Sequence, residues 1–156
     1  MFGYCIWYSL IGESRLSKLI LELSNKFKTD LFKAHITVHS KLNEQTANNL
    51  YRIQCCITKP WFSIDGNVYQ TETVSENNTR FYALQQDYLM YNIERLGRHH
   101  VSLAYRINRP FTEEEVEYAN SMVPVDTIRE NEMYVSLNDC RSCLPKHWNQ
   151  LKRHVF

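Results

Sequence analysis

The chain has 156 residues, of which 44% are hydrophobic and 13% aromatic, so it has enough length and apolar content for one globular domain spanning 1–156. Its 18 Lys and Arg residues against 17 Asp and Glu residues exclude the broad basic surface that binds long nucleic acids, but leave room for a local nucleotide site. The five cysteines do not form the pattern of a small disulfide-rich secreted protein, and no apolar run has the roughly 18 residues of a membrane span.

The first half of the chain alternates strand and helix patterns. Aromatic and branched residues over 2–10 predict a strand, and apolar residues at helical spacing over 16–27 predict a helix with Ser14 as its N-cap. A second strand is expected over 34–40, followed by a helix that Asn43 caps. We expect no signal peptide, because the first residues lack a basic segment followed by a long apolar stretch.

The second half predicts mostly strands. We expect them at 61–68, 69–74, 81–84, 100–105, 133–137 and 148–155. Residues 87–96 are expected to form a helix that ends at Gly97. Thr112 and Glu115 match a capping box at the start of another helix. The mixture of elements predicts an α+β domain.

Two of the expected strands carry the same pattern of histidine, apolar residue, hydroxyl residue and apolar residue. It reads His-Ile-Thr-Val from residue 35 and His-Val-Ser-Leu from residue 100. Because side chains alternate along a strand, His35 and Thr37 share one face. His100 and Ser102 share one face in the same way. We expect the two strands to face each other and to place two imidazoles and two hydroxyls around one phosphate.

Such a group of side chains suits the cleavage of a phosphodiester. Histidine, with an ordinary pKa of about 6.5, can accept a proton from the attacking oxygen or donate one to the leaving oxygen. The hydroxyls can donate hydrogen bonds to the non-bridging oxygens, where negative charge develops. The sequence has no HExxH motif and no paired acidic run, so we expect no metal and no cofactor.

The two motifs and their flanks resemble the 2H phosphoesterase superfamily, the LigT-like and cyclic phosphodiesterase enzymes that have two His-x-Thr/Ser motifs. The strand from Tyr4, the stretch 32–38 and the stretch 100–105 are similar to the small cyclic phosphodiesterases of plants and fungi. Ala34 departs from the proline that many members have at that place. The resemblance implies a two-lobed fold of two antiparallel sheets, flanked by helices, with a central cleft.

The resemblance also implies roles for five residues. His35 and His100 would be the acid and base, in an order that the sequence leaves open. Thr37 and Ser102 would bind the phosphate, and Tyr105 matches a tyrosine that helps to hold phosphate or water.

Further substrate contacts are expected from scattered residues. In similar phage enzymes a first-strand tyrosine, a mid-chain tryptophan and a late glutamate assist binding, and Tyr4, Trp61 and either Glu130 or Glu132 lie at comparable distances from the motifs. Trp7 could stack on a base, since aromatic faces accept any nucleobase. The alternative for each aromatic residue is a place in the core.

The function predicted from these features is a metal-independent phosphodiesterase that hydrolyses a cyclic phosphate or cyclic nucleotide of the 2′,3′ type. One alternative is a viral immune-evasion nuclease that degrades cyclic GMP-AMP or 2′-5′ oligoadenylate, as some small viral members of the superfamily do. Another class is a nucleotide-binding module without catalysis, and a third reading is a ligase of RNA 2′-5′ junctions. We expect a monomer in the cytoplasm, the host cytoplasm if the gene is viral, that meets nucleotides or RNA ends and no membrane.

Overall fold

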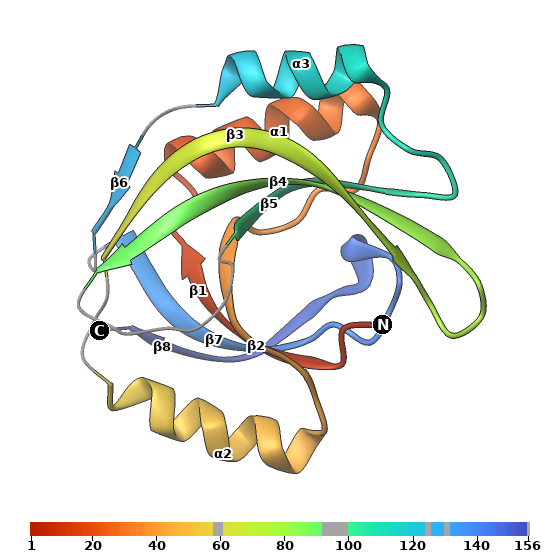
Figure 1. Cartoon of the computed structure of the whole chain (residues 1–156). Coiled ribbons are helices and arrows are strands. Elements are labelled where there is room, and N and C mark those ends of the chain that lie inside the picture. Colours follow the sequence, from red (N-terminus) through yellow and green to blue (C-terminus); the bar gives the residue numbers. More distant parts are fainter. Residues whose placement is uncertain (58–60, 92–99, 124–125, 130–131, 156) are drawn as a thin grey trace.

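The chain folds around one strongly curved sheet (Figure 1). The computed structural model describes residues 1–57, 61–91, 100–123, 126–129 and 132–155. The strands are β1 (Tyr4–Leu10), β2 (His35–Leu42), β3 (Trp61–Val74), β4 (Arg80–Tyr91), β5 (His100–Ile107), β6 (Asp126–Ile128), β7 (Met133–Asp139) and β8 (Asn149–Val155). The helices are α1 (Arg15–Phe27), α2 (Glu44–Cys55) and α3 (Glu113–Met122), with a 3-10 turn η2 (Pro145–His147). This composition confirms the α+β class.

The expectation of two separate sheets is wrong for the described part of the chain. There the strands form one sheet of eight strands in the order β6-β3-β4-β5-β2-β1-β7-β8, paired antiparallel. The two motif strands β2 and β5 are neighbours and pair at Ile36 and Val101. This pair joins two groups of four strands, and the curvature turns the inner faces of the two groups toward each other (Figure 1).

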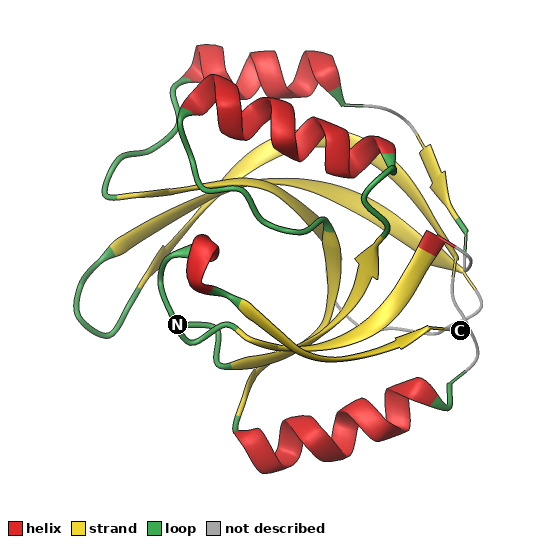
Figure 2. Cartoon of the chain, turned by 180° about the vertical axis from the view of Figure 1, so that it is seen from behind, coloured by secondary structure: helices red, strands yellow, loops and turns green. Residues whose placement is uncertain are grey.

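The helices lie outside the curve of the sheet. Helices α1 and α3 lie side by side over one group of strands, and α2 covers the other group (Figures 1 and 2). Each helix begins at the predicted cap, because the side chains of Ser14, Asn43 and Thr112 accept hydrogen bonds from backbone N–H groups of the first turn. The capping box of Thr112 and Glu115 is formed in full.

Two predicted elements differ from the structure. The stretch 87–91, expected to begin a helix, belongs to β4, where Tyr88 pairs with Ile64 and Asp87 with His100. Long-range pairing on both sides of β4 therefore overrides the local helical pattern. The rest of that expected helix, 92–96, lies outside the described residues. The two strands expected over 61–74 are one strand, β3, which has a register shift between Ile64 and Val68.

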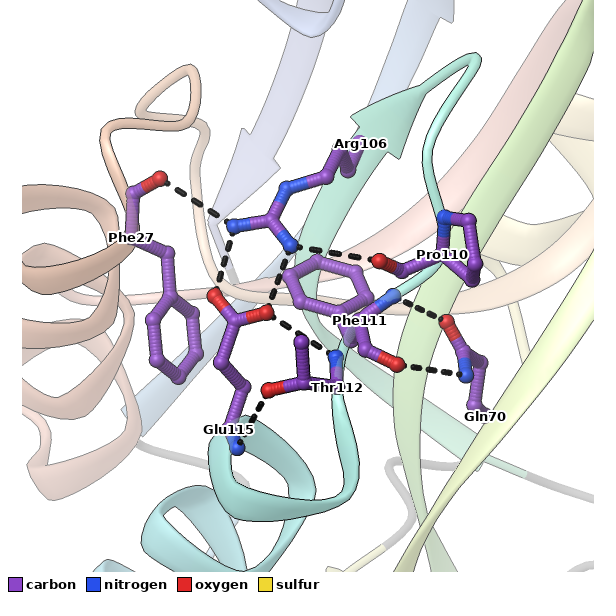
Figure 3. Close-up of polar contacts among 7 residues, drawn as sticks. All are labelled: Phe27, Gln70, Arg106, Pro110, Phe111, Thr112 and Glu115. Atoms are coloured by element: carbon purple, nitrogen blue, oxygen red, sulfur yellow. Dashed lines mark hydrogen bonds and ion pairs between the residues drawn. The ribbon is translucent and has the colours of Figure 1, made fainter.

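A buried ion pair attaches the end of β5 to two helices (Figure 3). The Arg106 guanidinium donates to both carboxylate oxygens of Glu115, each at 2.7 Å, and to the carbonyl oxygens of Phe27 and Pro110. This arginine lowers the pKa of Glu115 to about 2, against its desolvation by burial. Arg106 follows Tyr105 in β5, so these contacts attach that motif strand to helices α1 and α3.

None of the helices in the described residues has the length and hydropathy needed to cross a bilayer.

Candidate active site

The four motif side chains lie around the pair that joins the two halves of the sheet. Ile36 and Val101 are fully buried, each at 0% exposure, on the face away from the concave side. Alternation then turns the residues before and after them toward the concave side. In an antiparallel pair this register sets His35 beside Ser102 and Thr37 beside His100. The imidazoles therefore occupy one diagonal and the hydroxyls the other, with about 7–8 Å between the Cβ atoms along a diagonal of a regular ladder.

A β-bulge brings Tyr105 to the same face. Tyr105 lies three residues after Ser102, so strict alternation would turn it to the opposite face. The pairing of β4 with β5 shifts between Leu84 and Gln85, which leaves one extra residue in β5. Tyr105 consequently faces the same side as Ser102, and both line one cavity.

This cavity measures about 230 Å³ and contains all five residues to which the sequence assigned a phosphate site. They come from β2 and β5: His35, Thr37, His100, Ser102 and Tyr105. The other lining residues are Phe2, Cys5, Trp7, Ser40, Lys41, Thr71, Thr73, Phe81, Ala83, Gln85, Cys140 and Trp148. The structure brings the two motifs together in this cavity, but β2 and β5 are neighbouring strands of one sheet and do not face each other as expected.

His35 is buried and has a fixed orientation. Its ring stacks on Trp7 with centroids 3.6 Å apart and planes within 13°, and its Nδ1 lies 2.6 Å from the carbonyl oxygen of Lys33. Because a carbonyl oxygen only accepts hydrogen bonds, Nδ1 carries the proton and Nε2 presents its lone pair. Burial, and to a smaller extent the neighbouring His100, lowers the pKa of His35 to about 4. The ring is therefore neutral at pH 7.

His100 has a more open and more polar setting. It is the first residue of β5 and is half-buried at the cavity wall. On its other side, β4 places Asp87 directly opposite it. The two histidines thus differ in their neighbours, although the motifs that carry them are nearly the same.

The hydroxyl residues differ as well. Thr37 is half-buried and pairs with Trp7 across the β1–β2 ladder. Ser102 is 5% exposed and shares a hydrogen bond with the Tyr105 side chain. Burial raises the pKa of Tyr105, so its hydroxyl stays protonated and can donate. Thr37, Ser102 and Tyr105 together give this face three hydroxyl donors.

Several lining residues could not be found from the motifs. Trp148 follows η2, which lies inside the curve of the sheet (Figure 2), and its ring meets those of Tyr105 and His35 edge to face. Cys5 and Cys140 are buried in the same wall and hydrogen-bonded to each other. These residues come from the two ends of the chain, and no local pattern in the sequence connects them.

The expected substrate-binding residues have different locations. Trp7 lines the cavity. Tyr4 is absent from the described lining and packs its ring against the Arg141 guanidinium, 5.0 Å from the ring centroid. Trp61, also absent from that lining, begins β3 at its junction with Tyr91.

The two acidic candidates add nothing to the described cavity. Glu130 lies outside the described residues. Glu132 accepts a backbone hydrogen bond from Ile11 and is not part of the described lining. In the described residues no cluster of three or more His, Cys, Asp or Glu side chains could hold a metal ion.

No protein-family model matches the sequence, and no curated protein is significantly similar to it.

Proposed function

We propose that the protein is a phosphodiesterase that hydrolyses a cyclic phosphate or cyclic nucleotide of the 2′,3′ type by acid–base catalysis without a metal. The observation that carries the proposal is the arrangement around Ile36 and Val101. Two imidazoles on one diagonal and two hydroxyls on the other line a single cavity. The resemblance of the two motifs to the 2H phosphoesterases supports the same activity.

The surroundings of the histidines favour a division of labour. His35 is neutral at pH 7 and presents Nε2, so it is suited to take a proton from the attacking water. His100 would then donate a proton to the leaving oxygen as the bond between phosphorus and that oxygen breaks. The new phosphorus–oxygen bond comes from the water, and the products are a phosphomonoester and a free hydroxyl.

The hydroxyl groups would stabilise the negative charge that builds on the oxygens of the phosphoryl group. Thr37 and Ser102 can donate to the two non-bridging oxygens, whose charge rises in the transition state. Tyr105 supports Ser102 through their shared hydrogen bond. The aromatic side chains Trp7 and Trp148 shield the site from bulk water, which strengthens these interactions.

A larger substrate is the second candidate. A neighbouring cavity of about 730 Å³ shares Phe2, Lys41 and Thr73 with the first one. This adjoining space offers room for a second nucleotide, as in cyclic GMP-AMP or a 2′-5′ oligoadenylate. Degradation of such signals would make the protein a viral immune-evasion nuclease acting as a monomer in the host cytoplasm.

A substrate panel tests the proposal. The purified protein is incubated with 2′,3′-cyclic nucleotides, cyclic GMP-AMP, 2′-5′ oligoadenylate and RNA with a cyclic phosphate end, with and without EDTA, and products are read by mass spectrometry. We expect hydrolysis that EDTA leaves unchanged and that is lost in the His35→Ala/His100→Ala double variant. Tight binding without turnover would instead identify a nucleotide-binding module, and joined RNA ends would identify a ligase.

A further inference from the structure

Asp87 faces His100 across the β4–β5 ladder. The two residues are directly opposite each other in the antiparallel register. Side chains opposite each other in such a pair lie on the same face of the sheet, with Cβ atoms about 4.5–5.5 Å apart. The side chains of Asp87 and His100 are therefore neighbours on one face of the sheet.

The face that they share is the one that forms the cavity. Gln85 pairs with Ser102, and both line the cavity. The register runs without a shift from this pair to the pair of Asp87 and His100. Since Asp87 lies two residues after Gln85, it faces the same side.

A tyrosine from the next strand holds the carboxylate. The Tyr69 hydroxyl of β3 donates a hydrogen bond to Oδ1 of Asp87 at 3.1 Å. Asp87 is half-buried and is not part of the described cavity lining. It thus lies beside His100 but outside the described lining of the cavity.

We propose that Asp87 is a positioning residue for His100: held by Tyr69, its carboxylate orients the imidazole and stabilises the protonated ring. This inference rests on the proposed function, in which His100 is the proton donor. It explains how one of two similar motifs becomes the acid. The Nδ1 of His35 faces the neutral carbonyl of Lys33, whereas His100 faces a negative charge.

The other titratable groups near His100 cannot replace this carboxylate. Among the described residues these groups are His35 and Lys41 on β2, Tyr69 on β3, Tyr105 on β5, Cys5 on β1 and Cys140 after β7. None of these side chains is a carboxylate. Asp87 is the acidic residue that the described strands place against this ring.

The first test is independent of catalysis. The ring carbon protons of His100 are titrated by NMR in the wild type and in Asp87→Asn, which keeps the size of the side chain. We expect the midpoint to fall by about one pH unit, because an opposite charge nearby favours the protonated imidazole. The control Glu72→Gln removes an exposed carboxylate of β3 that pairs with Arg80, and should leave the midpoint unchanged. An equal midpoint in the wild type and Asp87→Asn would overturn the proposal.

The second test follows the pH dependence of kcat/KM. The alkaline limb of this profile reports the loss of the proton from His100. In Asp87→Asn this limb should move to lower pH by as much as the NMR midpoint does, and kcat should change by a larger factor than KM. Asp87→Glu should restore part of the limb, which a purely structural role would not do. A shifted NMR midpoint in a protein that cleaves no member of the panel would refute the proposed function and keep the Asp87–His100 coupling. If Asp87→Asn is active and its alkaline limb stays at the wild-type pH, the coupling between Asp87 and His100 is refuted and the proposed function is kept.

Discussion

His35 and His100 occupy equivalent places on the two sides of the Ile36–Val101 pair, yet they lie in opposite environments. His35 is 5% exposed, stacked on Trp7 and hydrogen-bonded to a carbonyl oxygen. His100 is half-buried and faces a carboxylate. The first environment disfavours a positive charge on the ring and the second favours it.

The comparison shows that a repeated motif need not give two identical environments. The motif residues place the two rings, and the strands next to them give each ring different neighbours. Neighbouring strand β1 supplies Trp7 to one ring, and β4 supplies Asp87 to the other. The assignment of the base to His35 and of the acid to His100 predicts that the two rings respond differently to the same experiments.

The largest effect is expected when each histidine is removed. His35→Ala and His100→Ala should each lower kcat for a 2′,3′-cyclic nucleotide by about 10³-fold, since each removes one proton transfer. A p-nitrophenyl phosphodiester separates the two roles, because its leaving oxygen needs no proton. On that substrate His100→Ala should lose less than about tenfold, while His35→Ala keeps its full loss. Equal losses for both variants on both substrates would contradict the assignment.

The next largest effect is expected from removing the hydroxyl groups of Thr37 and Ser102. Thr37→Val and Ser102→Ala should each lower kcat by about 10²-fold with a smaller change in KM, because these donors act on charge that develops in the transition state. Ser40→Ala is the matched control, since Ser40 lines the same cavity outside the motif and should retain wild-type kcat. Steady-state kinetics measures both constants. A loss confined to KM would show that the hydroxyls bind the ground state alone.

A third effect appears in stability against pH. The pKa of His35 is about 6.5 in the unfolded chain and about 4 in the folded protein, so the unfolded chain binds the extra proton between these values. Stability should be full above about pH 6.5 and fall by about 3 kcal/mol as the pH drops to about 4.

Denaturant unfolding at a series of pH values measures this fall. His35→Gln should lack it, because the amide does not titrate. His147→Gln, at an exposed histidine outside the cavity, should keep it. The same pH dependence in the wild type and His35→Gln would refute the buried neutral ring.

The smallest effect is expected from the ring that covers His35. Trp7→Phe keeps an aromatic partner but exposes the imidazole to more water, so the acid limb of kcat/KM should move to higher pH by less than one unit. The lost stacking area should cost about 1 kcal/mol in the free energy of unfolding. Trp61→Phe, on β3 away from the described cavity lining, should leave the limb in place. An unchanged limb in Trp7→Phe would separate the stacking from the protonation of His35.

Local signals in the sequence were enough to place the helices and most strands. Ser14, Asn43 and Thr112 each mark a helix start by a capping side chain that acts within one turn. The helix prediction was wrong for 87–91 because the strand conformation of this stretch depends on pairing with β3 and β5, most of whose residues are distant in sequence. The single sheet was missed for the same kind of reason, since it depends on one pair between the motif strands.

The part of the site that could be predicted from the sequence is the part that follows from the alternation of side chains along a strand. That rule places His35 with Thr37 and His100 with Ser102. Strict alternation would place Tyr105 on the face away from the cavity, because no feature of the β5 sequence predicts the bulge. Tyr105 was therefore assigned to the site only through the resemblance to the 2H phosphoesterases. Asp87 was assigned to a helix and so could not be linked to His100.

The pair of Ile36 and Val101 also determines how the spacing of the two imidazoles can change. Long ladders hold strands β1 and β4 to their motif strands, whereas among the described residues β2 and β5 meet at one pair. Among the described residues this pair is therefore the direct ladder contact between the two strands that carry the rings. Side-chain volume at 36 and 101 is therefore expected to influence the spacing of the two rings, although neither residue lines the cavity.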